Sequence, residues 1–346
     1  MTTTLPAWRA LHDFYRRWRG GARHALLRAG AMGLALLSLS ATARADYPEK
    51  PVRIVVPFAV GAGADIASRF VAGKLGERWG KGTVVDNQVG ANSIIGAQAV
   101  ARAPADGYTL LVPNDTTLAA NPALYTKLPY APLKDFAPIA LIGETPFVLV
   151  ASPRFPVHSV KELVDAARAK PGEINFASSG VASSHHLAME MLMDGAHVKL
   201  MHVPYKGASD AATGVMGDQV EVMFAGVSAV LPFLQSGKLV PLAVTTPERL
   251  TVLPDVPTMA ESGFPGYRYG AWLGFVAPAG TPAAIVDKVN ADINSILRQP
   301  ETRDRLLAIG FLPAAPGTPG EFRKHIESEM ARYGKLIRAA GIEPSR

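Results

Sequence analysis

The chain of 346 residues contains no cysteine. This absence excludes thiol nucleophiles, cysteine-ligated zinc sites, iron–sulfur clusters and disulfide bonds. It also excludes the cysteine through which an exported lipoprotein is attached to lipid. The chain further lacks a P-loop lysine motif and an H-E-x-x-H zinc motif. We therefore expect no cofactor, no metal and no lipid anchor.

Most of the chain has no excess of either positive or negative charge. The formal charge is +6, but residues 1–45 hold seven arginines and one aspartate, which account for all of it. The rest of the chain is electrically balanced. A balanced surface gives no electrostatic basis for binding nucleic acid or an anionic membrane. We predict no nucleic-acid partner, which leaves small molecules and proteins as binding partners.

Long apolar runs are also missing. The longest, at about 29–39, is shorter than the roughly 20 apolar residues that a membrane span requires. It follows an arginine-rich segment and precedes the small residues 43–45, which is the three-part pattern of a secretory signal peptide. We predict a signal peptide over 1–45, cleaved before Asp46, and a periplasmic product. Arg16 and Arg17 leave the choice between general secretion and twin-arginine export open.

Short β-branched runs alternate with helix-period segments along the remaining chain. This alternation predicts an α/β fold in which mostly parallel sheets are flanked by helices. Nine candidate strands in about 300 residues suit two lobes better than one sheet. The candidate strands are residues 52–56, 83–85, 109–112, 147–151, 174–177, 198–203, 220–224, 240–244 and 272–276.

Helix starts are marked by capping patterns. Capping boxes predict helices beginning at Ser159, Thr258 and Thr318, and a Thr-Pro pair predicts another at 281–282. Two apolar stripes at helical spacing predict buried helix faces. One comprises Ile66, Phe70, Val71, Leu75 and Trp79, and the other Ile285, Val289, Ile293 and Ile296. Proline and glycine concentrate at 153–156 and 263–270, which are our candidate crossovers between lobes.

Three loops of small and polar residues follow successive predicted strands, at 57–65, 87–93 and 113–117. The carboxyl ends of parallel strands meet at one edge of a sheet, where open α/β folds bind ligands. Small residues before a helix let an anion approach its free N–H groups. The first loop lacks the third glycine of a dinucleotide-binding motif. These loops therefore predict a crevice that binds a small anion.

A fourth loop, 176–187, contains four serines and the pair His185-His186. It permits a hydrolase interpretation with Ser184 as nucleophile and His185 as base, or a metal site at the two histidines. Both interpretations are weak, because adjacent residues of a helix diverge and no G-x-S-x-G motif is present. Helix capping accounts for Ser183 or Ser184. A fifth loop at 202–208 contains Lys206, either a contact for a carboxylate or a solvated lysine.

The sequence resembles the substrate-binding proteins of tripartite tricarboxylate transporters, often called Bug proteins. The resemblance covers essentially the whole chain after the predicted signal peptide. Each motif alone is weak, but together, in order and at family spacing, they are specific. The motifs are residues 51–58, 106–111, 121–125, 134–138, 203–207 and 254–258.

The resemblance implies a two-lobed, type II-like periplasmic binding protein with crossover hinge strands. On that basis we expect lobe 1 at 46–146 plus 270–346 and lobe 2 at 147–269. It also implies a monomer that closes on a small organic carboxylate and presents it to the large and small subunits of a membrane permease. Its ligand-binding residues would be Phe58, Gly61, Asp65, Asn87, Thr116, Ser179, Gly180, Ser183, Ser184 and Gly207.

Some positions depart from the family pattern. Ala62 stands where a glycine is usual, Ala64 where a threonine or serine is common, and His185 where a smaller residue is usual. Ala225 replaces a frequent acidic residue, which argues against an amino-acid ligand. The alternatives are an exported serine esterase, and a ligand sensor for a membrane signalling protein. We expect no catalytic residues and no enzyme activity.

Overall fold

The structure is a computed structural model that describes residues 47–345. Apart from Tyr47, these residues belong to one compact unit, Pro48–Arg346. The predicted signal peptide, 1–45, lies outside the described residues. Among residues 47–345 we find no helix with the length and apolar character needed to cross a bilayer.

A mixed sheet runs through the unit in the order β2-β1-β3-β9-β4-β7-β5-β6, with β8 and β10 also paired with β4. Strands β1, β2 and β3 are parallel to one another, as are β5, β6 and β7, whereas β4 and β9 run antiparallel to their neighbours. The strands are β1 (Val52–Val56), β2 (Thr83–Asn87), β3 (Thr109–Leu111), β4 (Phe136–Ala151), β5 (Asn175–Ser178), β6 (Met201–Pro204), β7 (Val222–Gly226), β8 (Val240–Val244), β9 (Gly270–Pro278) and β10 (Leu312–Pro313).

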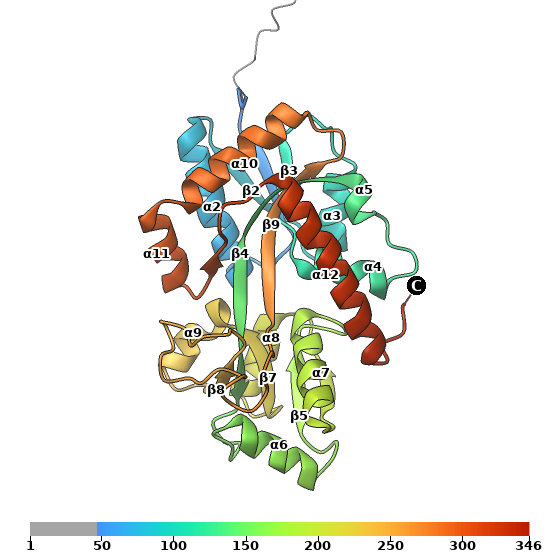
Figure 1. Ribbon diagram of the computed structural model, residues 1–346, viewed down its shortest axis with the longest axis vertical. Helices are drawn as coiled ribbons and strands as arrows, with labels where there is room; N and C mark the ends of the chain where they lie inside the picture. Colours follow the sequence, from blue (N-terminus) through green and yellow to red (C-terminus); the bar gives the residue numbers. More distant parts are fainter. Residues whose placement is uncertain (1–46, 346) are drawn as a thin grey trace, which may run out of the picture. The chain divides into compact units, whose positions relative to one another are not determined.

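The long strand β4 changes partner part-way along its length. Its residues up to Pro146 pair with β9, and from Phe147 onward it pairs with β7. We call the part around β1, β2, β3, β9 and β10 the upper half and the part around β5 to β8 the lower half, as they stand in Figure 1. Consecutive residues of one strand thus belong to both halves.

Helices cover both halves, and α12 starts in the upper half and ends beside α7 of the lower half (Figure 1). The helices are α2 (Gly63–Trp79), α3 (Ile94–Ala101), the π-helix η1 (Thr116–Ala120), α4 (Asn121–Leu124), α5 (Pro132–Asp135), α6 (Val160–Ala169), α7 (Ser184–Ala196), α8 (Ala208–Met216), α9 (Val227–Gln235), α10 (Ala283–Leu297), α11 (Pro300–Ala308) and α12 (Pro319–Ala339).

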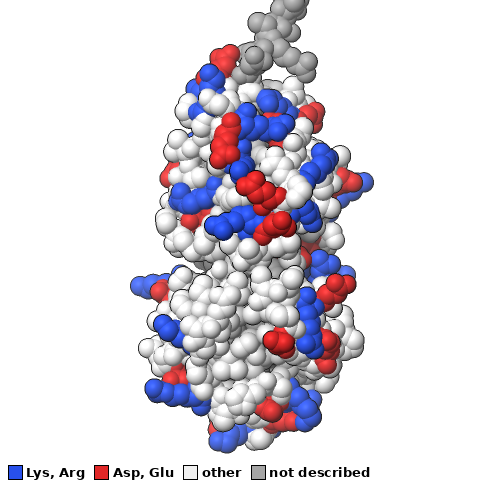
Figure 2. Space-filling view, turned by 90° about the vertical axis from the view of Figure 1, so that its left-hand side faces the viewer, with Lys and Arg blue, Asp and Glu red and all other residues white. Residues whose placement is uncertain are grey.

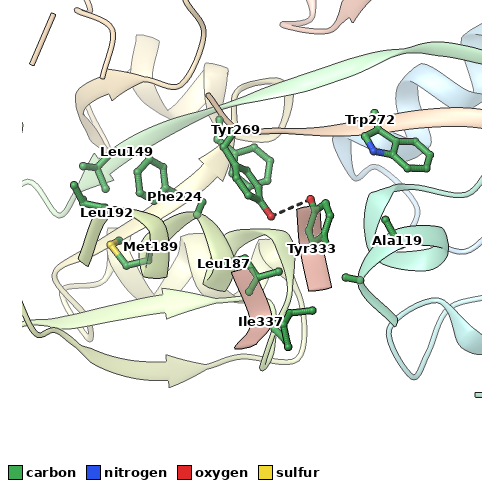
Figure 3. Close-up of a cluster of buried hydrophobic side chains, with 14 of the residues drawn as sticks. Ala119, Leu149, Leu187, Met189, Leu192, Phe224, Tyr269, Trp272, Tyr333 and Ile337 are labelled. Carbon is green, nitrogen blue, oxygen red and sulfur yellow. Dashed lines mark hydrogen bonds between the residues drawn. The ribbon is translucent and has the colours of Figure 1, made fainter. Parts of the chain in front are cut away.

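One apolar core continues from the upper half into the lower half. Figure 3 shows its centre, where Tyr269, just before β9, and Tyr333 of α12 point their hydroxyl groups at each other. The Tyr269 hydroxyl donates to the Tyr333 hydroxyl at 3.0 Å. Leu187 of α7 and Leu149 of β4 belong to the same core. Apolar packing across the junction stabilises the arrangement of the two halves.

Each of the nine predicted strands has a counterpart in the structure, but three other expectations are wrong. The capping box at Thr258 forms, with Glu261 N–H donating to Thr258 Oγ1 at 3.0 Å, yet turns follow it instead of a helix. Gly263, at φ +97°, and Pro265 stop helix propagation. Residues 153–156, predicted as a crossover, follow the end of β4 and lead to α6.

The predicted buried stripe of α2 is wrong in part: Val71 and Leu75 are fully buried and Phe70 and Trp79 are half-buried, but Ile66 is not. Ile66 is 41% exposed, whereas the small residues Ala67 and Ala72 are fully buried with Val71. A Cβ on Gly76 would lie 3.0 Å from the backbone nitrogen of Thr83. Because the helix packs this closely on β2, small residues share its core face with Val71 and Leu75. The predicted apolar face of α10 is confirmed at Val289, Ile293 and Ile296.

Candidate functional site

Four of the predicted ligand-binding residues form one hydrogen-bonded cluster in the upper half. The Asp65 carboxylate accepts from the Gly61 N–H at 2.9 Å and from Asn87 Nδ2 at 2.7 Å. Asn87 Nδ2 also donates to the Phe58 carbonyl at 2.9 Å. Arg69 donates to both Asp65 oxygens at 3.0 Å and to Asn87 Oδ1. The Asp65 side chain thus shapes the loop between β1 and α2.

We expect Asp65→Asn to lower the free energy of unfolding by about 1.5 kcal/mol. The substitution removes charge-assisted hydrogen bonds from a carboxylate that is 1% exposed. Denaturation in urea measures the loss. Asp86→Asn is the matched control, because Asp86 pairs with Arg53 at the surface of the same half. The control should lose less than about 0.5 kcal/mol. Equal losses in the two variants would contradict a structural role for Asp65.

The serine-rich loop between β5 and α7 carries three more predicted residues. Ser183 caps α7, its hydroxyl accepting from the His186 N–H at 3.4 Å. Gly180 has φ +128°, which an L-amino acid rarely adopts, and its carbonyl accepts from the Ser183 N–H at 3.2 Å. The Ser179 hydroxyl is 2.8 Å from His185 Nδ1. The N-terminus of α7 therefore lies directly beside this loop.

Two more of the predicted ligand-binding residues, Thr116 and Ser184, contact each other. Their hydroxyls are 3.1 Å apart, and they join η1 of the upper half to α7 of the lower half. Both residues are buried. The Ser184 hydroxyl donates to Asp115 Oδ2 at 2.7 Å. Thr116 and Ser184 thus connect the two halves.

Asp115 is the buried centre of this connection. Its side chain is fully buried and also accepts a hydrogen bond from the Tyr333 hydroxyl. Burial raises the pKa of Asp115 to about 6, although the bonds from Tyr333 and Ser184 oppose the shift. Tyr333 in turn accepts from Tyr269, so the network reaches the start of β9 (Figure 3).

The tenth predicted residue, Gly207, is the N-cap of α8 and has extended backbone, and nothing lies within 4 Å of a Cβ built on it. It lies next to the serine-rich loop in the fold, because the Tyr205 N–H donates to the Ser178 carbonyl at 2.9 Å. Lys206 beside it is exposed. The turn at 203–207 and the serine-rich loop thus form one edge of the lower half.

The two halves also touch at a second place. A Cβ on Gly63 at the start of α2 would overlap the Ser228 side chain at the start of α9. The Ser228 hydroxyl has no hydrogen-bond partner among the described residues. Two helix N-termini, which carry partial positive charge, therefore meet here. The contact lies between the first loop of the upper half and the lower half.

The structure gives no support to the hydrolase or metal interpretations. Ser184 bonds to Asp115 and Thr116, whereas His185 bonds to Ser179. Within residues 47–345 there is no group of three or more His, Asp or Glu side chains placed to hold a metal ion. His186 bonds instead to the Ala182 N–H and to Glu190.

A cavity of about 450 Å³ lies apart from the predicted residues, between the C-terminal ends of α7 and α12. It contains none of the ten. Its walls are formed by Leu187, Glu190, Met191, Met193, Asp194, His197, Val198, Lys199, Leu200, Leu336, Ala339 and Ala340.

On the surface, positive and negative side chains are mixed. The face in Figure 2 shows both signs side by side over the upper half and a largely uncharged area in the middle of the lower half. This agrees with the balanced charge of the chain after residue 45. Any attraction for an anion therefore comes from local groups, such as helix N-termini.

Residues 67–342 match the family described as the tripartite tricarboxylate transporter family receptor. The chain belongs to this family. It is 34% identical to the protein BugT of Bordetella pertussis over 314 residues, which cover 90% of this chain and 95% of BugT.

Solved structures agree with this assignment. The receptor superimposes on the R. palustris protein Rpa4515 with adipate at a TM-score of 0.83 and 35% identity, covering 86% of this chain and all of that one. It superimposes on MatC of Rhodopseudomonas palustris with bound malate at a TM-score of 0.77 and 33% identity, covering 84% and 100%. The receptor has the two-lobed α/β fold of periplasmic binding proteins.

Proposed function

We propose that this receptor captures a small organic carboxylate in the periplasm, between its two lobes, and delivers it to a tripartite tricarboxylate transporter permease. The observation that carries the proposal is its likeness, over 84% to 86% of this chain and the whole of the two solved chains, to structures that hold adipate and malate. Loops of small and polar residues from both halves, next to helix N-termini, are consistent with an anionic ligand.

Simple energetics favour contacts from both lobes. Micromolar affinity requires about −8 kcal/mol, while the loss of translational and rotational freedom costs at least about 4 kcal/mol. A hydrogen bond to a charged group contributes about 1.5 to 3 kcal/mol. One loop cannot supply enough such bonds. Donors on opposite sides of the ligand can, and they favour the closed form through differential affinity.

We propose that lobe 1 comprises 46–146 with 270–346 and lobe 2 comprises 147–269. This division follows the change of partner along β4 between Pro146 and Phe147. The ligand would lie between the Gly63–Ser228 contact and the Thr116–Ser184 contact. The residues proposed to surround it are Phe58, Gly61, Asp65, Asn87, Thr116, Ser179, Gly180, Ser183, Ser184 and Gly207.

The partners follow from the same proposal. The large and small permease subunits would receive the ligand from a monomeric receptor, which residues 1–45 would direct to the periplasm. The proposed activity is binding without chemical conversion. The hydroxyl groups of Thr116 and Ser184 would act in joining the lobes, and neither would act as a nucleophile.

Thermal unfolding in the presence of adipate, malate, succinate and citrate tests the proposal. A ligand present at 100 times its Kd should stabilise the receptor by about 2.7 kcal/mol, or roughly 5 °C in Tm. Replacing Ser183 and Ser184 together with alanine should abolish the shift. Ser236→Ala, at the exposed end of α9, is the control and should keep it.

The outcomes separate two kinds of failure. If no carboxylate raises the Tm of the unmodified receptor, the proposed function is wrong. If a carboxylate raises the Tm equally in the unmodified receptor and in the double variant, the function stands and the proposed placement of the ligand is wrong.

A further inference from the structure

Three histidines surround the serine-rich loop, and none of them has a role in the proposed contacts with ligand. His185 and His186 belong to the first turn of α7, and His202 belongs to β6. Each imidazole is hydrogen-bonded to a different residue of the loop, at Ser179, Ala182 and Ser178 respectively. The loop is therefore held at both ends and in the middle.

The tautomer of His202 follows from its contact with Ser178. The Ser178 hydroxyl donates to the Gly180 carbonyl at 2.9 Å and accepts from the Gly180 N–H at 3.1 Å. A hydroxyl has one proton, so the 2.6 Å contact with His202 Nε2 requires that this nitrogen carry a hydrogen. His202 thus fixes the side chain that closes the turn at Gly180.

The tautomer of His186 follows in the same way. The Ala182 N–H donates to His186 Nδ1 at 2.8 Å, so this nitrogen carries no proton. The hydrogen is on Nε2, which faces Glu190 Oε1 at 3.1 Å. Ala182 is buried at φ +57°, a conformation that costs a non-glycine residue free energy and persists only where its surroundings hold it.

Ring stacking joins these side chains to the core. The His186 and His202 rings stack at 3.8 Å, with 10° between their planes, and His202 also stacks on Phe176 at 4.9 Å. His185 stacks on Phe147 at 5.0 Å. Two imidazoles in face-to-face contact cannot both be charged without strong repulsion. At least one of these two rings is therefore neutral in this packing.

We propose that His185, His186 and His202, in their neutral forms, are positioning residues that hold the serine-rich loop in the shape that binds the carboxylate. The inference rests on the proposed function, because it concerns the same loop. The His186 ring holds that part of the loop through Nδ1, which accepts from the Ala182 N–H. The shape of the binding loop thus depends on groups that do not touch the ligand.

The electrostatic surroundings set the direction of the pH effect. Glu190 of α7 is the carboxylate in contact with the His186 ring. His186 is in turn the titratable ring that stacks on His202. Burial lowers the pKa of His185 to about 4, and burial together with His186 lowers that of His202 to about 4. His185 and His202 are therefore neutral at neutral pH. Their hold on the loop should be constant from pH 6 to 8 and weaken only near pH 4, where these two rings gain protons.

Variants of His186 test the clamp, with adipate and malate as probes and calorimetric titration from pH 4.5 to 8. In His186→Asn, the amide oxygen can replace Nδ1 as an acceptor and does not titrate. This variant should keep the affinity within about threefold. His186→Leu has no acceptor, and its affinity should fall about tenfold at every pH.

Hydrogen exchange at the Ala182 amide gives a readout that needs no ligand. It should be slow in the unmodified receptor and in His186→Asn, and fast in His186→Leu. If His186→Leu does not fold, the clamp is tested by comparing carboxylate affinity and Ala182 exchange between His186→Asn and the unmodified receptor. Equal affinities and equal exchange in all three proteins would overturn the clamp. Failure of the unmodified receptor to bind any carboxylate would instead overturn the proposed function.

Discussion

Gly143→Ala should lower the free energy of unfolding of the receptor by about 4 kcal/mol. Gly143 lies in β4 with φ +150°, where any other residue is strained by about 1 to 3 kcal/mol. A Cβ there would also overlap the Leu312 carbonyl oxygen and the Phe311 ring. Phe311 is fully buried and cannot move aside, which adds about 1 to 3 kcal/mol. Urea denaturation measures the sum.

Gly172→Ala is the matched control for this prediction. Gly172 also has a positive φ, +79°, but nothing lies within 4 Å of a Cβ built on it. Gly172→Ala should lower the free energy of unfolding by about 1 kcal/mol, from backbone strain alone. If Gly143→Ala and Gly172→Ala lower the free energy of unfolding by the same amount, the overlap of the added Cβ with Leu312 and Phe311 has no measurable cost.

Asp115→Asn should stabilise the receptor at pH 7.5 by about 3 kcal/mol and have little effect at pH 4. The pKa of Asp115 is raised from 3.8 to about 6 by burial. Between these values, the folded state keeps a proton that the unfolded state has lost, so stability falls as the pH rises. At about 1.4 kcal/mol for each pKa unit, the loss above pH 6 is about 3 kcal/mol.

Asparagine reproduces the uncharged carboxyl group and cannot ionise. Its oxygen can still accept from Ser184 and Tyr333, as Asp115 Oδ2 does. The measurement is the free energy of unfolding of both proteins at pH 4 and pH 7.5. A variant that is less stable than the unmodified receptor at both pH values would contradict the prediction.

Asp292→Asn is a control that should change the free energy of unfolding in the opposite direction. Burial favours a higher pKa for Asp292, but hydrogen bonds from Lys288, Trp79 and Arg78 hold its pKa below the ordinary value. Its charged form therefore stabilises the fold above the ordinary pKa, and this contribution is lost as the pH falls. Asp292→Asn should be destabilised at pH 7.5 and approach the unmodified receptor in acid.

Local signals predicted most of the elements but not the longest strand. The capping box at Thr318 and the alternation of β-branched runs with helical segments depend on neighbouring residues, and these predictions are confirmed. The first part of β4 contains Pro138, Gly143 and Pro146, which argue against a strand. It is a strand because β9 pairs with it, with register shifts near Pro138 and Gly143.

The site shows the same division between local and distant signals. Asp65 follows β1 and Asn87 ends the neighbouring parallel strand β2, so sequence order predicted that their loops lie at one edge of the sheet, although not that the two side chains bond to each other. Arg69 lies four residues after Asp65, and helical spacing could have added it to the cluster. Asp115 and Tyr333 are separated by 218 residues, and no local pattern indicates their contact. The same is true of His202, 24 residues from Ser178.

The course of β4 through both halves has a mechanical consequence. β4 pairs with β9 up to Pro146 and with β7 from Phe147 onward, so no loop residue separates the two pairings. We therefore expect rotation of one lobe against the other to be shared among several backbone torsions of this strand. We expect the receptor to resist opening in proportion to the angle, as an elastic beam does, and to return to its resting angle when the cargo leaves.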